Sequence, residues 1–252
     1  MKMWYEDDAF WETWAPFLFG KERWENTSEE VTNLISLLKI NPGASVLDLC
    51  CGPGRHSLEF ARRGFLVAGV DRTRTYLDKA RRQAEAEGLN LEFIEEDMRS
   101  FCRPEAFDAA INLFTSFGFF EDEKEDELVM KNVHRSLREG GAFVVDLMGK
   151  EILARIFRER DWQETDGAIT LVERKVSKDW TWMENRWILL KDGKIHESRF
   201  SHRPYSAAEL TALLSDCGFN SIRAYGDLAG APYDHQAKRL VVTAQKRKVS
   251  AK

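Results

Sequence analysis

The chain has 252 residues, of which 43% are hydrophobic and 31% are charged, a composition typical of a soluble globular protein. This length is sufficient for one large domain, or for one domain that contains an inserted element. The formal net charge of −5 argues against a nucleic-acid partner, and no apolar run approaches the roughly 20 residues that span a membrane.

The opening residues, MKMWYEDDAFWE, lack the basic region and the apolar stretch of a secretory signal, so we expect a cytoplasmic protein. The cysteines show neither a CxxC pair nor the cysteine–histidine spacing of zinc ligands. We therefore expect reduced thiols and no metal site. The four cysteines are Cys50, Cys51, Cys102 and Cys217.

The segment 1–27 is unusually rich in aromatic side chains. It is either a helical segment packed against the main body or a lid that excludes water from a bound cofactor, and both can hold. Its aromatic residues are Trp4, Tyr5, Phe10, Trp11, Trp14, Phe17, Phe19 and Trp24.

Helix and strand patterns alternate from residue 28 to about residue 150. Helical spacing occurs in TSEEVTNLISLLK, RHSLEFARRG, TRTYLDKARRQAEAEG and DEKEDELVMKNVHRSLREGG, the last of which ends at a double glycine. Short apolar runs occur in SVLDLC, FLVAGVD, LEFIEED, FDAAINLF and AFVVDLM. This alternation predicts an α/β fold with a doubly wound parallel sheet, whose ligands bind at the carboxyl ends of the strands.

The pattern changes after residue 160. Runs of β-branched and aromatic residues, with KDG as a hairpin turn, predict three antiparallel strands at roughly 168–177, 180–190 and 194–203. A helix in YSAAELTALLSDCGF and strands in SIRAYGDL and RLVVTAQK then return to the main sheet. The expected division is an N-terminal segment 1–27, a cofactor-binding domain 28–160 and 204–248, and a β insertion 161–203.

A glycine-containing loop, Cys50-Cys51-Gly52-Pro53-Gly54, follows the first predicted strand, which contains Asp48. The next two strands end in Asp71 and Asp97, so three acids lie at successive strand ends. Each acid either caps the following helix or binds a ligand. An acid about 20 residues after such a loop is typical of a group that binds ribose hydroxyls.

The spacing Gly52-x-Gly54-x-x-Ser57 lacks the third glycine of a dinucleotide loop, and no Gly-Lys-Ser/Thr follows as in a P-loop. Asp48, placed before the loop, would repel a pyrophosphate but suits a ligand with an ammonium or sulfonium group. The pattern therefore favours S-adenosylmethionine.

The segment VLDLCCGPGRHSLEFARRGFLVAGVD resembles the nucleotide-binding segment of class I S-adenosylmethionine-dependent methyltransferases. EEDMRSF and FDAAINLFTSFGFF resemble the third-strand and fourth-strand motifs of that family. The resemblance implies a Rossmann-like, seven-stranded, mostly parallel sheet with an antiparallel last strand. The sequence departs from the family at Cys50, where a glycine is usual.

The resemblance also implies roles for individual residues. Asp48 and the backbone of Cys50, Cys51 and Gly52 would hold the methionine portion beside Gly54, and Arg55 would pair with its carboxylate. Asp71 would bind both ribose hydroxyls with Arg72 beside the adenine, and Asp97 and Met98 would bind the adenine edge. Asn112 and Leu113 would line the sulfonium.

The acceptor is expected to be a small molecule, because the fourth-strand segment NLFTSF lacks the Asn/Asp-Pro-Pro-aromatic pattern of enzymes that methylate base amino groups. Methyl transfer is an in-line displacement that leaves S-adenosylhomocysteine, with nitrogen or oxygen favoured over carbon as acceptor. Positioning contributes much of the rate, and a base only removes a proton. Candidate bases are His202, Tyr205 and Tyr233, with His235 nearby.

Two other functions remain open at this point: a NAD-dependent oxidoreductase on the same type of sheet, and a non-catalytic cofactor-binding module. The tryptophans of the insertion either line an acceptor pocket or form core or homodimer contacts. They are Trp162, Trp180, Trp182 and Trp187.

Overall fold

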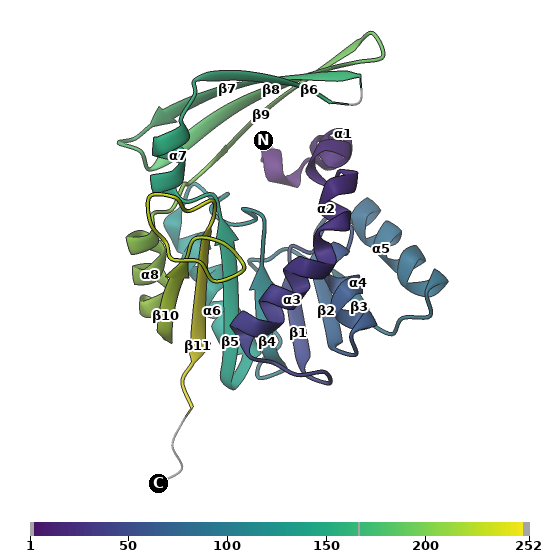
Figure 1. The fold of residues 1–252 in the computed structure, drawn as a ribbon, viewed down its shortest axis with the longest axis vertical. Helices are drawn as coiled ribbons and strands as arrows, with labels where there is room; N and C mark the ends of the chain where they lie inside the picture. The colour runs from purple at the N-terminus through teal and green to yellow at the C-terminus, as the bar shows by residue number, and fades with distance from the viewer. Residues whose placement is uncertain (1–2, 166, 249–252) are drawn as a thin grey trace.

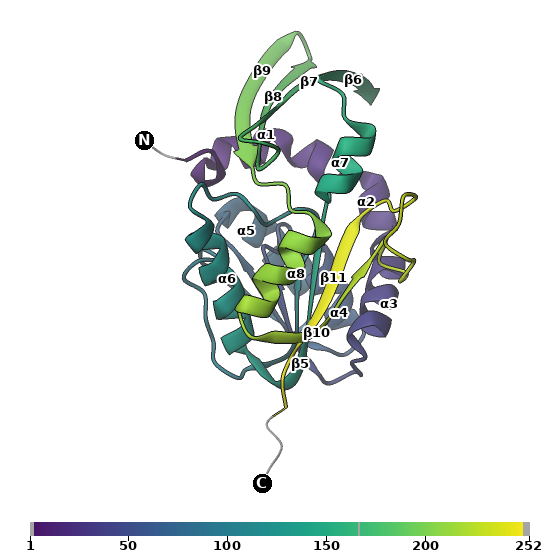
Figure 2. The ribbon, with the colours of Figure 1, turned by 90° about the vertical axis from the view of Figure 1, so that its left-hand side faces the viewer.

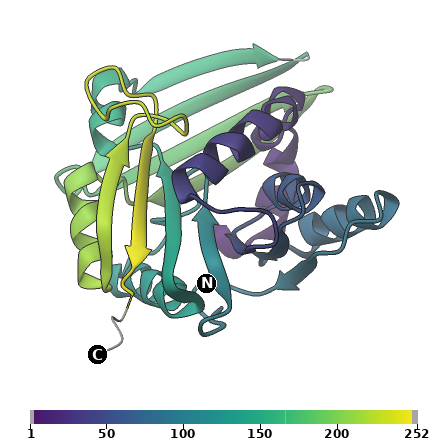
Figure 3. The same ribbon diagram turned by 60° about the horizontal axis from the view of Figure 1, so that its bottom comes forward.

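The computed structural model describes residues 3–165 and 167–248. Residues 1–2 of the predicted N-terminal segment and residue 166 of the predicted insertion lie outside the described residues. The described part contains a seven-stranded sheet, with an antiparallel sheet across one end of it (Figure 1 and Figure 3). No helix in this part is both long and apolar enough to cross a membrane.

The main sheet has the strand order β10-β11-β5-β4-β1-β2-β3. Strands β1 to β5 pair in parallel, whereas β11 runs antiparallel to both β5 and β10. The predicted doubly wound, mostly parallel sheet with an antiparallel last strand is confirmed. The strands are β1 (Ser45–Leu49), β2 (Leu66–Asp71), β3 (Glu92–Glu95), β4 (Phe107–Asn112), β5 (Leu137–Leu147), β10 (Phe219–Tyr225) and β11 (Leu240–Lys246).

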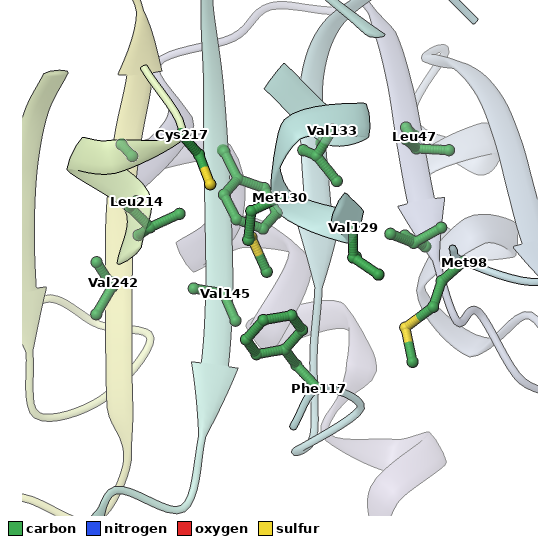
Figure 4. Packing of buried hydrophobic residues seen from close by; sticks show 14 of the residues in the cluster. Leu47, Met98, Phe117, Val129, Met130, Val133, Val145, Leu214, Cys217 and Val242 are labelled. Carbon is green, nitrogen blue, oxygen red and sulfur yellow. The ribbon is translucent and has the colours of Figure 1, made fainter. Parts of the chain in front are cut away.

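Helices cover both faces of the main sheet because successive strand residues point to opposite sides (Figure 2). Val46 packs in the cluster that contains Leu34 of α3, whereas its neighbour Leu47 packs in the cluster that contains Val129 of α6. Figure 4 shows this second cluster, in which residues of α6 and the end of α8 meet β5 and β11. The helices are α3 (Thr27–Leu38), α4 (Arg55–Arg62), α5 (Arg74–Ala86), α6 (Glu123–Ser136) and α8 (Ala207–Asp216).

Helix α6 ends at Ser136 and not at the double glycine that the sequence pattern indicated. The residues that follow already belong to β5, because Leu137 pairs with Phe107 of β4. The register then shifts before Ala142 pairs with Ala109, and Gly140 has a positive φ of 77° within this irregularity. Backbone pairing with a neighbouring strand has therefore replaced the last turn of the predicted helix.

The insertion contains four strands, so the predicted number of three is wrong. The additional strand, β6 (Arg160–Thr165), pairs with β7 (Ala168–Ser177), followed by β8 (Trp182–Lys191) and β9 (Lys194–His202). Most side chains of β6 are exposed, so the apolar alternation that reveals a half-buried strand is absent. A short helix, α7 (Lys150–Ile156), connects the main sheet to this antiparallel sheet.

The aromatic N-terminal segment lies between the two sheets (Figure 1). Trp14 is fully buried, packs in a cluster with Leu189 of β8, and donates a hydrogen bond from Nε1 to Ser198 Oγ at 2.9 Å. Tyr5 packs instead in the core of the main sheet. The segment therefore contacts both sheets through η1 (Trp4–Glu6), α1 (Asp8–Leu18) and α2 (Lys21–Glu25).

Candidate active site

A cavity of about 810 Å³ lies at the carboxyl ends of β1, β2 and β4, between the N-terminal segment and the antiparallel sheet. Its size is within the usual range for small-molecule sites. Eleven of the predicted cofactor-binding and catalytic residues line it: Asp48, Cys50, Cys51, Gly52, Arg55, Asp71, Arg72, Asp97, Met98, Leu113 and His202.

Four of the predicted site residues do not line this cavity. Gly54 has a φ of +79°, and a Cβ there would lie 2.8 Å from Ala80 Cβ, so its smallness allows α4 to approach α5. Asn112 is fully buried and donates from Nδ2 to the Leu49 carbonyl at 3.1 Å. The other two, Tyr205 and Tyr233, point to carboxylates outside the cavity wall.

Asp71, at the end of β2, is fixed by backbone amides on one side. Gly52 N donates to its Oδ2 and Thr73 N donates to its Oδ1, both at 2.8 Å. A carboxylate has about four lone-pair sites, so two remain for a pair of ligand hydroxyls. Burial raises the pKa of Asp71, and the charge of Asp48 adds to that rise.

Asp97 lies after β3 and is held by Arg99. The Arg99 backbone N and Nε donate to Asp97 Oδ1 at 2.8 and 2.9 Å, and Nη2 donates to Oδ2 at 2.7 Å. Although burial opposes it, this hydrogen bonding lowers the pKa of Asp97, so the carboxylate is ionised at neutral pH. Oδ2 retains a free lone pair that can accept from an amino group.

The loop after β1 contributes its backbone to the site, and its two cysteine thiols are unreactive. Cys50 adopts a positive φ of 63°, the left-handed conformation that favours glycine, which explains why glycine is usual at this position in the family resembled. Burial raises the pKa of both Cys50 and Cys51 well above the usual range, so these thiols stay protonated and unreactive. Asp48, also buried, accepts from Ser57 Oγ at 2.6 Å.

Three guanidinium groups surround the ring of Phe114 at the cavity wall. Arg55 pairs with Glu30, and Arg239 forms hydrogen bonds to Asp146 at 2.7 and 3.0 Å. Arg23 lies with its guanidinium carbon 4.7 Å from the ring centre and has no hydrogen bond or ion pair from its side chain within residues 3–165 and 167–248. Burial, and then the charges of Arg55 and Arg239, lower its pKa.

Sequence reasoning missed Arg23, because it lies in a short helix with no motif and far in the chain from the glycine loop. Among the cationic residues at this wall, it is the one whose charge has no carboxylate partner in the described structure. An anionic ligand group is therefore the partner that this arrangement favours.

The N-terminal segment is attached to the rim of the cavity by hydrogen bonds. Arg72 Nη1 donates to the carbonyl of Tyr5 at 2.9 Å and to Asp8 Oδ1 at 3.1 Å. Tyr76 donates its hydroxyl hydrogen to the carbonyl of Trp11 at 2.5 Å. These contacts hold aromatic side chains of the segment over the cavity, including Trp4 and Trp11 in its lining.

His202, at the end of β9, is the one predicted base that lines the cavity. Burial lowers its pKa to about 4, so the ring is neutral at pH 7. Its Nδ1 lies 3.4 Å from Nδ2 of Asn185, and since an amide nitrogen donates, Nδ1 accepts and Nε2 carries the hydrogen. Tyr205 and Tyr233 instead donate to Asp126 and Glu151, each at 2.8 Å.

Comparison with known proteins identifies the family. Residues 46–141 match the family model described as a methyltransferase domain. The chain is 25% identical over 210 residues to the putative methyltransferase YqeM of Bacillus subtilis (strain 168), covering 81% of this chain and 84% of that protein. It is 27% identical over 223 residues to the glycine/sarcosine N-methyltransferase of Aphanothece halophytica, covering 87% and 82% respectively.

A solved S-adenosylmethionine-dependent methyltransferase from Clostridium acetobutylicum ATCC 824 has the same fold, with a TM-score of 0.80 at 16% identity over 95% of this chain and 98% of that chain. The chain is a methyltransferase with the fold of class I S-adenosylmethionine-dependent enzymes. The oxidoreductase alternative is thereby rejected.

The acids of the cavity fit the positive charge of the cofactor. Asp48 and Asp71 line the cavity, and burial raises the pKa of both. A sulfonium or ammonium group nearby would favour their ionised forms. Gly52 allows Phe19 of the N-terminal segment to pack against the loop, because a Cβ at this position would lie 3.0 Å from the Phe19 ring.

Proposed function

We propose that this methyltransferase transfers a methyl group to nitrogen or oxygen of a small-molecule acceptor by in-line displacement, releasing S-adenosylhomocysteine. The observation that carries the proposal is one cavity that joins the acids at the ends of β1, β2 and β3 to the inner face of the antiparallel sheet. Nitrogen is favoured, because a relative that aligns over most of both chains is a glycine/sarcosine N-methyltransferase.

The residues at the strand ends are proposed to hold the cofactor. The free lone pairs of Asp71 would accept from both ribose hydroxyls, and Asp97 would accept from the adenine amino group beside Met98. Asp48, Leu113 and the backbone of the glycine loop would surround the methionine portion. When bound, S-adenosylmethionine supplies the electrophilic methyl group.

We propose that Arg23, and not Arg55, binds the carboxylate of the methionine portion. Arg55 already donates to Glu30 and to Thr27 Oγ1, the latter at 2.9 Å. Arg23 has all five guanidinium hydrogens available within the described residues, and both arginines line the cavity.

Catalysis in this proposal comes from orientation and from exclusion of water. With a pKa of about 4, His202 is a poor base for an ammonium group, so its role is to position the acceptor through Nε2–H. Burial and the neighbouring carboxylates raise the pKa of Tyr205 and of Tyr233, and neither lines the cavity, so neither acts as a base. The N-terminal segment 1–27 would act as the lid.

We also propose the domain division that the sequence predicts, with a cofactor-binding domain 28–160 and 204–248 and a β insertion 161–203. We propose that the insertion forms a homodimer contact through its outer face, where Trp162 and Ile195 are 65% and 69% exposed. We also propose a cytoplasmic location and no nucleic-acid or membrane partner.

The test is incubation of the purified protein with methyl-labelled S-adenosylmethionine and a small-molecule metabolite extract, followed by mass analysis. The proposal predicts a labelled product below about 1 kDa and formation of S-adenosylhomocysteine. Calorimetry with S-adenosylhomocysteine runs in parallel. Binding without any transfer would contradict the proposal and support a non-catalytic module.

A further inference from the structure

The inner face of the antiparallel sheet forms the acceptor end of the cavity. Cross-strand partners share a face of a sheet, so the rows Arg174–Asn185–Phe200 and Met183–His202 lie on the same side. All five of these residues line the cavity. Residues at alternate positions, such as Glu173, face outward.

The charged groups at this end of the cavity have a net positive charge. Arg158, Asp161 and Arg174 line the cavity, and His202 beside them is neutral. Arg158 pairs with Asp161 at 3.7 Å, which leaves Arg174 without an ion pair among the described residues. One positive charge therefore remains on the wall that faces the acceptor.

Arg174 is half-buried, and its side chain makes one hydrogen bond within the described residues, from Nη1 to the carbonyl of Arg158 at 3.3 Å. A guanidinium has five donor hydrogens in a planar fork that matches carboxylate and phosphate oxygens, so four are left without an acceptor. Burial lowers the pKa of Arg174, which reflects the cost of removing this charge from water. The residue remains protonated because its usual pKa is so high.

Neighbouring groups on the same wall are also donors. Asn185 lies directly opposite Arg174 and donates to His202 Nδ1, which leaves a hydrogen on His202 Nε2. The indole N–H of Trp187, two residues along β8, is buried and has no acceptor in the described part of the chain. Apart from Asp161, which pairs with Arg158, and the amide oxygen of Asn185, the polar groups of this wall are donors, which favours an anionic ligand group.

We propose that the methyl acceptor carries an anionic group, a carboxylate or a phosphate, which Arg174 binds at the inner face of the antiparallel sheet. This inference rests on the proposed function. The nucleophilic atom of the acceptor then points away from Arg174 toward the strand ends of the main sheet, with Asn185 and His202 between the two ends. A neutral analogue would leave the Arg174 guanidinium unpaired, so it would bind more weakly.

The first test identifies the ionisable groups on the labelled product from the metabolite extract. The proposal predicts a carboxylate or a phosphate on the product, and fragmentation in the mass analysis distinguishes the two, also where an amine makes the molecule a zwitterion. A labelled product with neither group overturns the anionic acceptor while leaving methyl transfer intact. Absence of any labelled product overturns the proposed function itself.

The second test compares variants on that acceptor. Arg174→Gln should raise the KM for the acceptor roughly 10- to 100-fold, the effect of losing charge-assisted hydrogen bonds, with kcat within about threefold. Arg174→Lys should recover part of this loss, since it restores the charge but not the planar fork. Arg160→Gln, on the outer face and 83% exposed, is the matched control and should leave KM unchanged.

Affinity for S-adenosylhomocysteine is measured on each variant by calorimetry and should not change, because Arg174 lies at the other end of the cavity. An unchanged acceptor KM in Arg174→Gln overturns the proposal. Equal losses in acceptor and cofactor binding also overturn it, since they would mean that Arg174 supports the cavity as a whole.

Discussion

The two ends of the cavity differ in charge and in how the chain builds them. At the cofactor end, Asp48 and Asp71 belong to β1 and β2, and Asp97 follows β3 directly in the chain after Glu96. At the acceptor end, the unpaired cation Arg174 comes from an antiparallel sheet inserted late in the chain. The acids at the strand ends and Arg174 on the antiparallel sheet therefore suit different ligand groups.

The largest expected effect concerns a pair outside the cavity, where Tyr205 follows β9 and donates to the fully buried Asp126 of α6. Burial raises the pKa of Asp126 to about 7, so the folded state retains a proton that the unfolded chain loses near pH 4. Stability therefore falls as the pH rises from about 4 to about 7. Relative to Asp126→Asn, the wild type should lose about 3 kcal/mol of unfolding free energy between pH 5 and pH 8.

Denaturant unfolding of both proteins at the two pH values measures this difference. Parallel changes in the wild type and in Asp126→Asn would show that Asp126 does not titrate in this range.

Asp71→Ala tests the cofactor end. We expect a loss of at least tenfold in affinity for S-adenosylhomocysteine, because a buried site loses the acceptor of two hydroxyl groups. Asp78→Ala is the matched control, since Asp78 lies on α5 and pairs with Arg81 at 2.9 Å on the surface. Calorimetry that gives equal affinities for the wild type and Asp71→Ala would refute the assignment of Asp71.

The smallest expected effect concerns the predicted bases. His202→Ala should lower kcat/KM for the acceptor about 2- to 10-fold, the loss of one hydrogen bond, with cofactor affinity unchanged. Tyr233→Phe should leave kcat/KM within about twofold, because its hydroxyl donates to Glu151 outside the cavity. Because burial lowers the pKa of His202 to about 4, the pH profile should show no inflection from this residue between pH 6 and pH 9. A larger effect of Tyr233→Phe would contradict the conclusion that Tyr233 takes no part in catalysis.

The cofactor end could be predicted from the sequence because its signals are local. The positions of Asp48, Asp71 and Asp97 follow from which strand each one ends, and the parallel sheet then brings strand ends together. Arg23 could not be found in this way, because its relation to Arg55 and Phe114 depends on how α2 packs. Nor could the positions of Tyr205 and Tyr233, which point away from the cavity.

The acceptor end was only partly accessible to sequence reasoning. The antiparallel pattern was recognised, but β6 was missed because its side chains are mostly solvated. Arg174 and Asn185 come together only through the cross-strand register of β7 and β8, which one residue of slippage would invert. Long-range pairing of this kind is not encoded in any short segment.

The most direct measurement is a crystal structure of the protein with S-adenosylhomocysteine. The account predicts the ribose hydroxyls on Asp71, the adenine amino group at Asp97, the methionine carboxylate at Arg23, and the sulfur directed toward the side of the cavity that contains His202 and Arg174. A nucleoside seated against β8 and β9, with its carboxylate on Arg174, would contradict the assignment of both ends.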